Sequence, residues 1–258
     1  MKNIMKSIGY EVLHSKMLVR LYILFVALMV LTTMLNTDSS GVSAMLAGND
    51  GTSYEFPMLI VAIIVGVICG SDFNDKVANY EILSGHSRKT VFFARALMAV
   101  CISSVLATVL CFVPIIVGSA IFGWGNKLVF SDLIIRNLLL IFPFARLTAF
   151  LVVVTFIVKN PYVIMASGFV IMLGGGILGD LVGDGKNCFI SIYNMKYLCS
   201  YEGWNTYNLD PVKGVVEYYA YNSTVTSSLV LGTVFASIIM IIFYLFMGYA
   251  LFRRDELN

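Results

Sequence analysis

The sequence predicts an all-α protein built as one membrane domain with six transmembrane helices. Hydrophobic residues make up 59% of the chain and charged residues only 12%, whereas an ordinary soluble domain carries about 25% charged residues. Six largely uncharged runs have a length near the roughly 20 residues that a helix needs to cross a bilayer. The polar stretches between them are too short to fold as separate domains of about 100 residues. All 258 residues are therefore expected to belong to one domain.

The six predicted transmembrane helices follow from these apolar runs and the charges that bound them. They cover residues 17–35, 56–71, 96–122, 137–158, 161–182 and 223–252. The third run is long enough to cross the bilayer with tilt, and it contains Pro114, where a kink is expected. The fifth run starts with Pro161, which is favourable in the first turn of a helix.

The distribution of lysine and arginine predicts the orientation of the chain. Basic residues gather in the amino-terminal arm, in residues 72–95 and at the carboxyl end, while residues 36–55 have none. Positively charged segments stay in the cytoplasm. Both termini and the 72–90 loop are therefore predicted on the cytoplasmic side of a bacterial plasma membrane, and the long 183–222 loop on the outer side.

The first 16 residues have the pattern of an amphipathic helix. Apolar side chains recur at helical spacing opposite three charged ones; the apolar set is Ile4, Met5, Ile8, Val12 and Leu13, and the charged set is Lys2, Lys6 and Glu11. Such a helix is expected to lie on the inner membrane surface. A solvated, frayed terminus is the alternative.

The predicted loop between the second and third spans contains a short helix. In "FNDKVANYEILSGHSRKTVFFARAL", Val77, Tyr80 and Leu83 are three residues apart, which places them on one helical face. Gly85 can adopt the left-handed conformation that ends a helix, and Ser87 can cap the next one. The pattern predicts a helix, a sharp stop and a new helix.

The apolar face of this short helix could contact the lipid surface or a soluble partner. A helix seated on lipid is expected to be strongly basic. Here Asp72, Asp75 and Glu81 outnumber Lys76. The charge pattern favours a protein partner.

The same stretch resembles the coupling segment of the ABC-2 type permeases, the six-span membrane subunits of ATP-binding-cassette exporters. An acidic residue and a helix precede "ILSGHSRKTVFFARAL", in which Gly85, Ser87 and Arg88 are followed by Arg95 at the start of the third span. The resemblance in layout covers the whole chain: interfacial helix, six spans, coupling loop and long outer loop. The short "VKNP" link between the fourth and fifth spans is also similar.

The resemblance implies a non-catalytic subunit that binds no nucleotide and docks its coupling helix on a separate ATPase, which holds ATP and Mg²⁺. It also implies a second permease, identical or related. The implied coupling residues are Asp72, Val77, Tyr80, Glu81, Leu83, Gly85, Ser87 and Arg88. Compact size and the "GHSRK" loop are most similar to permeases for lantibiotics, bacitracin and related antimicrobial peptides, which implies a peptide-like substrate and self-immunity or resistance. A six-span scaffold or sensor that holds a soluble partner without transport is the alternative.

Arg146 is an unusual residue in the predicted fourth span. A guanidinium near the bilayer centre costs about 2.5 to 3.5 kcal/mol on insertion scales, so such a residue usually faces a cavity or a partner. Arg146 could line a translocation pathway or gate, or it could pair with another helix or snorkel. Pro143 would free a backbone carbonyl that could accept from Arg146.

Glycines and cysteines give two further predictions. Gly175 and Gly179 permit close helix packing, either at a dimer interface or within the chain. Cys188 and Cys199 lie in the 183–222 loop, which is rich in tyrosine and expected to form short helices or re-entrant turns. The two cysteines could form a disulfide worth about 2 to 3 kcal/mol or remain two free thiols.

Several function classes lack support in the sequence. The chain has only two histidines, His14 and His86, and no zinc-ligand pattern. The stretch "GDLVGDGKN" differs from a phosphate-binding loop because Asp180 replaces the first glycine and Asn187 the hydroxyl residue that would hold magnesium. Nucleic-acid binding is not indicated, since the basic residues follow the membrane topology.

Overall fold

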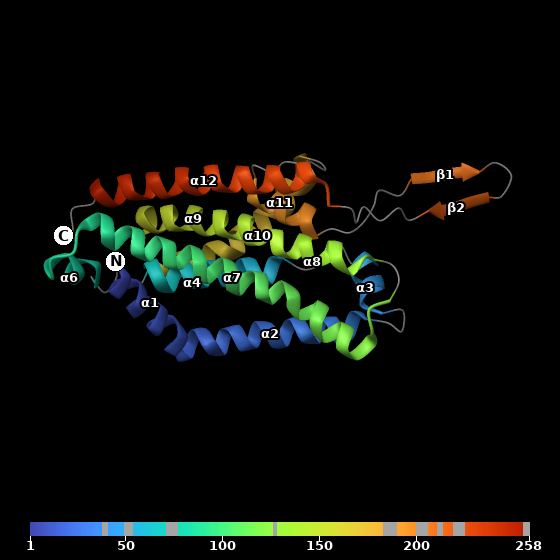
Figure 1. The fold of residues 1–258 in the computed structure, drawn as a ribbon, viewed down its shortest axis with the longest axis horizontal. Coiled ribbons are helices and arrows are strands. Elements are labelled where there is room, and N and C mark those ends of the chain that lie inside the picture. The colour runs from blue at the N-terminus through green and yellow to red at the C-terminus, as the bar shows by residue number, and fades with distance from the viewer. Residues whose placement is uncertain are drawn as a thin grey trace.

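The structure, a computed structural model, describes residues 1–37, 41–48, 54–70, 77–125, 128–182, 190–199, 206–210, 214–218 and 225–254. Long helices run side by side along the length of the molecule, and a two-stranded hairpin projects from one end (Figure 1). Both chain termini lie at the other end.

Over the residues that the structure describes, four helical segments are long and apolar enough to cross a membrane. They are α2 (Lys16–Asn36), α7 (Arg88–Phe122), α8 and α9 together (Phe130–Leu139 and Ile141–Val158), and α12 (Ser227–Arg254). Two shorter apolar segments accompany them: α4 with the π-helix η1 (Glu55–Val65 and Gly66–Gly70), and Pro161–Gly174, which is the first part of α10 (Pro161–Val182). Each predicted apolar run is therefore helical over most of its described residues, and the prediction of a helical membrane protein is confirmed.

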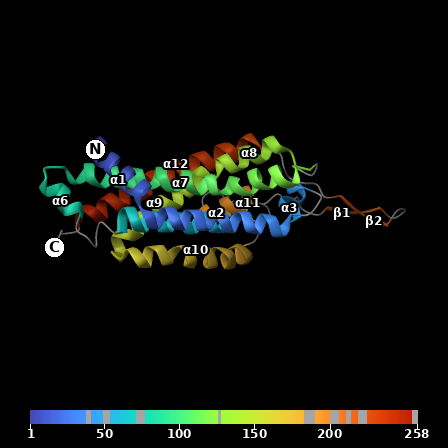
Figure 2. The same cartoon turned by 90° about the horizontal axis from the view of Figure 1, so that it is seen from below.

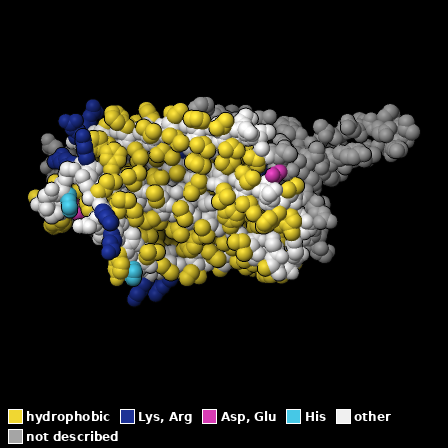
Figure 3. All heavy atoms as spheres, viewed as in Figure 1, with side chains coloured by type: hydrophobic (Ala, Val, Ile, Leu, Met, Phe, Trp, Pro, Cys, Tyr) yellow, Lys and Arg dark blue, Asp and Glu magenta, His cyan; other side chains and the backbone are white. Residues whose placement is uncertain are grey.

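The outer surface of the bundle is apolar over most of its length (Figure 3). Exposed side chains on α2 and α12 include Ile23, Leu24, Ile242 and Phe246. Water would oppose so wide an apolar surface, whereas lipid chains solvate it. The surface thus indicates a membrane-embedded protein.

Helix α9 lies at the centre of the bundle. It contacts α7, α12 and α4, and most of its side chains are buried. Helix α10 lies at the edge, beside α4 (Figure 2). The two helices approach closely at Gly168, where a Cβ atom would lie 2.8 Å from the Cβ of Ala62. Close packing of α10 thus occurs about two turns before the predicted Gly175 and Gly179, whose surroundings lie outside the described side chains.

Two helices begin earlier than their apolar runs. Helix α7 starts at Arg88 instead of residue 96, because the Ser87 hydroxyl accepts a hydrogen bond from the backbone N–H of Thr90 at 3.2 Å. Helix α8 starts at Phe130 instead of residue 137, since an amphipathic helix tolerates Asp132, which interrupts an apolar run. Arg136 of the same helix is buried, with 2% exposure. It ends at Leu139, and α9 begins at Ile141.

Further elements occupy the segments between the long helices. Residues 36–55 contain α3 (Val42–Gly48). The predicted outer loop contains α11 (Ser191–Cys199), as expected of a short helix, and an antiparallel hairpin of β1 (Thr206–Asp210) and β2 (Gly214–Tyr218), which was not predicted. The strands pair from Thr206 opposite Tyr218 to Asp210 opposite Gly214.

Candidate functional site

The predicted short helix is α6 (Val77–Leu83), which lies at the end of the bundle that holds both termini (Figure 1). Two backbone hydrogen bonds end it: the N–H of His86 donates to the carbonyl of Glu81 at 3.2 Å, and that of Gly85 to Ile82 at 3.0 Å. This is the Schellman arrangement, which needs a left-handed residue. Gly85 supplies it with a φ of 96°. The chain therefore turns sharply from α6 into α7.

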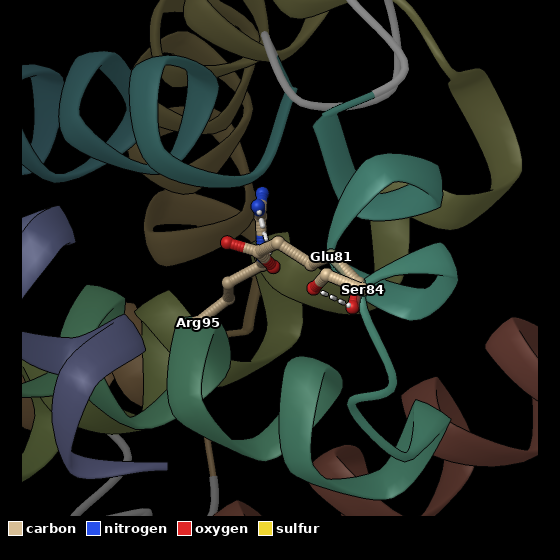
Figure 4. Close-up of polar contacts among 3 residues, drawn as sticks. All are labelled: Glu81, Ser84 and Arg95. Atoms are coloured by element: carbon tan, nitrogen blue, oxygen red, sulfur yellow. Dashed lines mark hydrogen bonds and ion pairs between the residues drawn. The ribbon is translucent and has the colours of Figure 1, made fainter.

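An ion pair fastens α6 to α7. Arg95 of α7 donates from Nη2 and Nε to the Oε2 atom of Glu81, at 3.0 and 3.3 Å (Figure 4). The side chains are only 9% and 23% exposed, so water screens the pair less than a surface pair. Glu81 was expected to contact a partner, which stays a prediction; within the chain its carboxylate contacts Arg95. Ser84, drawn in the same figure, donates its hydroxyl to the carbonyl of Glu81 at 2.7 Å.

Helix α1 (Lys2–His14) adds a third element to this site. Its buried side chains Ile4, Ile8 and Val12 belong to the main core, and the helix contacts α7. The predicted apolar face thus covers protein instead of lipid, because the early start of α7 provides a surface there. Leu13, assigned to the same face, is exposed.

The electrostatics of Glu81 reflect this crowding. Burial raises the pKa of the Glu81 carboxyl above its ordinary value, and the carboxylate of Glu11 on α1 acts in the same direction. The neighbouring His86 opposes them and lowers the pKa. The pKa of Glu81 therefore depends on burial, on Glu11 of α1 and on His86, which lies between α6 and α7.

Two apolar side chains of α6 point away from the bundle. Tyr80 is 69% exposed and Leu83 is 81% exposed, while Ile82 between them packs against the main core. Ser87 and Arg88 are also exposed. Of the other predicted coupling residues, Val77 is described only as the first residue of α6, and Asp72 lies outside the described residues.

Exposed basic side chains surround this end of the molecule (Figure 3). They belong to α1 and to the ends of α2, α7, α9 and α12: Lys2, Lys6, Lys16, Arg20, Arg88, Lys89, Lys159, Arg253 and Arg254. In the part of the chain that the structure describes, Lys196 is the one exposed basic residue outside this group. The α6 end is therefore positively charged.

Arg146 lies elsewhere, buried inside the bundle with 1% exposure. Its Nε donates to the hydroxyl of Ser191 on α11 at 2.6 Å. Pro143 lies in the first turn of α9, because the helix restarts at Ile141, and this position costs no helical hydrogen bond. A hydrogen bond from Arg146 to a carbonyl freed by Pro143 stays a prediction.

The cysteine prediction concerns α11 as well. Cys199 is a buried free thiol at the end of this helix, and burial raises its pKa well above the ordinary value. Cys188 lies outside the described residues. Over the described residues, no three histidine, cysteine, aspartate or glutamate side chains come together as a metal site would require.

Sequence reasoning missed the residues that connect the elements. The Glu81–Arg95 pair joins positions 14 apart, a spacing that no single helix brings together. Ser191 is 45 residues from Arg146. The charge of Arg95 beside an apolar run was the available signal for the first contact, and nothing in the local pattern marks the second.

Comparison with known proteins leaves the family of the chain open. No protein-family model matches the sequence, and a search of curated proteins gives no match either.

Proposed function

We propose that the chain is the membrane subunit of an ATP-binding-cassette transporter of the ABC-2 type, with six spans and α6 as its coupling helix. A separate ATPase subunit carries ATP and Mg²⁺ and binds α6. A second permease, identical or related, completes the route through the membrane. The observation that carries the proposal is that Tyr80 and Leu83 are exposed on a helix that an ion pair fastens to a membrane helix.

The exposed pair is suited to docking. Isolated exposed apolar residues are common on proteins, but Tyr80 and Leu83 share one face of a seven-residue helix outside the bundle. A helix of this kind binds a partner by inserting its apolar side chains into a groove. The Glu81–Arg95 contact on the opposite side of α6 transmits displacement to α7.

Helix α7 can pass this movement on, because it contacts α1, α2, α4 and α9. Movement of its first turns therefore reaches most of the helices in the bundle. The nine exposed basic residues at the α6 end support a cytoplasmic position for this end. The partner ATPase would then have access to both α6 and ATP.

The proposed substrate is an amphipathic peptide of the antimicrobial or lantibiotic class, removed from the membrane for self-immunity or resistance. Its support is the similarity of the compact chain and its "GHSRK" elbow to permeases of that group. The exposed apolar surface of the bundle is compatible with a substrate that enters from lipid.

The test is the ATPase activity of the protein reconstituted in nanodiscs together with the ATPase subunit that co-purifies with it. We expect Leu83→Asp to abolish stimulation of this activity by a lantibiotic such as nisin, because a carboxylate cannot enter an apolar groove. Leu13→Asp is the matched control: Leu13 is 75% exposed on α1. Peptide-stimulated turnover that persists in Leu83→Asp contradicts the proposal, and a stable complex without any peptide response indicates a scaffold.

A further inference from the structure

Helix α11 occupies the interior of the bundle at the end away from α6 (Figure 1). It contacts α8, α9 and α10. Its side chains Met195, Leu198 and Cys199 belong to the main apolar core, and Tyr193 and Asn194 are buried as well. A helix of nine residues thus fills space between longer helices.

Two side-chain hydrogen bonds connect α11 to its neighbours. Ser191 accepts from Nε of Arg146 on α9 at 2.6 Å. Nδ2 of Asn194 donates to the hydroxyl of Thr233 on α12 at 3.1 Å. Both contacts join polar groups, so the same groups can form hydrogen bonds with water when α11 moves out of the bundle.

Within the described part of the chain, buried polar atoms without partners lie on α11 and on α12, the helix that Asn194 contacts. Over the described residues, Oδ1 of Asn194 and the hydroxyl oxygen of Ser237 are buried and have no hydrogen-bond partner. Ser237 lies one turn beyond Thr233 on α12. Buried polar atoms without partners weaken the packed position and favour a state in which water reaches them.

We propose that α11 is a displaceable plug, which leaves the space between α8, α9, α10 and α12 when its contacts with Arg146 and Thr233 open. The displacement goes beyond the proposed function and does not depend on it. If the end away from α6 is the outer end, as the proposed function requires, the plug closes the outer side of the route.

The native thiol of Cys199 reports on this movement, because it is 1% exposed while α11 is in place. The protein is placed in nanodiscs, which expose both membrane sides, with the other four cysteines replaced by alanine. Labelling by a water-soluble maleimide is then measured over time. When opening is rapid, the labelling rate is proportional to the population of the open state. Slow labelling is expected for the native contacts.

Thr233→Val removes the hydroxyl that binds Asn194 and keeps the shape of the side chain. We expect it to accelerate labelling of Cys199 about tenfold. Thr233→Ser keeps the hydroxyl and is the matched control, with a rate within about twofold of the native protein. Ser191→Ala removes the hydroxyl that accepts from Arg146. It should also accelerate labelling of Cys199, and it replaces Thr233→Val if that variant does not fold.

A second reporter separates local from global opening. Cys111 on α7 is buried in the same core, so a variant with Cys111 as its single cysteine carries the same Thr233→Val change. Labelling of Cys111 is expected to stay slow. Equal acceleration at Cys111 and Cys199, equal rates for valine and serine at position 233, or immediate labelling of the native protein each overturns the proposal.

Discussion

The two ends of the helix bundle are held together by different kinds of contact. At the α6 end, the Glu81–Arg95 ion pair fastens a helix whose apolar side chains point outward. At the opposite end, α3 is held by backbone hydrogen bonds, from the N–H of Val42 to the carbonyl of Gly123 at 3.1 Å and from Ser43 to Trp124 at 2.8 Å.

Apolar packing reinforces the same contrast. The α3 end has its own small core, in which the buried members are Val42, Leu46, Ile115, Leu128 and Leu133. Among the α6 side chains that the structure describes, Ile82 is the one that packs against the main core. The difference indicates that one end is closed by its own side chains, whereas the other exposes apolar side chains.

The largest difference is expected from one substitution made at both ends. Leu46 is 1% exposed and Leu83 is 81% exposed. Leu46→Ala should lower the free energy of unfolding by about 3 kcal/mol, because it leaves a cavity in the small core. Leu83→Ala should change it by less than about 0.5 kcal/mol. Thermal unfolding of the purified protein in detergent measures both, and equal losses would remove the contrast between the ends.

Glycines with positive φ give the next comparison. Gly41 has a φ of 89°, and a Cβ there would lie 3.0 Å from the backbone nitrogen of Gly125. Gly85 has a similar φ but open space around it. Gly41→Ala should therefore cost about 2 kcal/mol, from strain and crowding together, and Gly85→Ala about 1 kcal/mol, from strain alone. The same unfolding assay applies, and an equal cost at both sites contradicts the close approach at Gly41.

Removing the ion pair tests how α6 is held. Arg95→Met should lower the free energy of unfolding by about 1.5 kcal/mol, since the partly buried carboxylate of Glu81 loses its partner. Arg95→Lys keeps the positive charge and should lose less than half of that. Hydrogen exchange at the backbone of α6 should also become faster in the methionine variant. A protected α6 in Arg95→Met would show that other contacts hold the helix.

The smallest expected effect is the pH response of Glu81. Its pKa is raised in the folded protein, chiefly by burial, so the folded state binds this proton more tightly than the unfolded state. The contribution of Glu81 to stability therefore falls as pH rises from the ordinary glutamate range through the raised pKa. Unfolding temperatures are compared for the native protein and Glu81→Gln between about pH 4 and pH 7. The unfolding temperature of the native protein should fall relative to that of Glu81→Gln as the pH rises. A difference that is independent of pH contradicts the raised pKa.

The local features of the α6 end were predictable from sequence because they depend on neighbouring residues. The stop at Gly85 and the cap at Ser87 each involve backbone groups within five positions. Apolar run length likewise predicted the helices of the bundle. The early starts of α7 and α8 were missed because charged residues lie within their first turns.

Contacts between distant segments were not predictable in the same way. The side of α6 that turns toward α7 depends on the angle of the elbow, so sequence alone could not show that Glu81 meets Arg95 while Tyr80 points outward. The same holds for α11, whose neighbours are set by the packing of four other helices. The hairpin of β1 and β2 was missed because its tyrosines also fit a membrane-surface segment.

The continuity of α7 joins the two ends of the molecule. Its 35 residues give a rod of about 52 Å at 1.5 Å per residue. The rod begins at the elbow after α6 and ends at Gly123, whose carbonyl binds α3. Treated as a lever pivoting near its base, it turns a tilt of about 5° into a shift of roughly 4 to 5 Å at the far tip. That distance exceeds the length of the hydrogen bond between Val42 and Gly123. A small tilt of α7 at the α6 end is therefore enough to break the backbone hydrogen bonds between α3 and the end of α7.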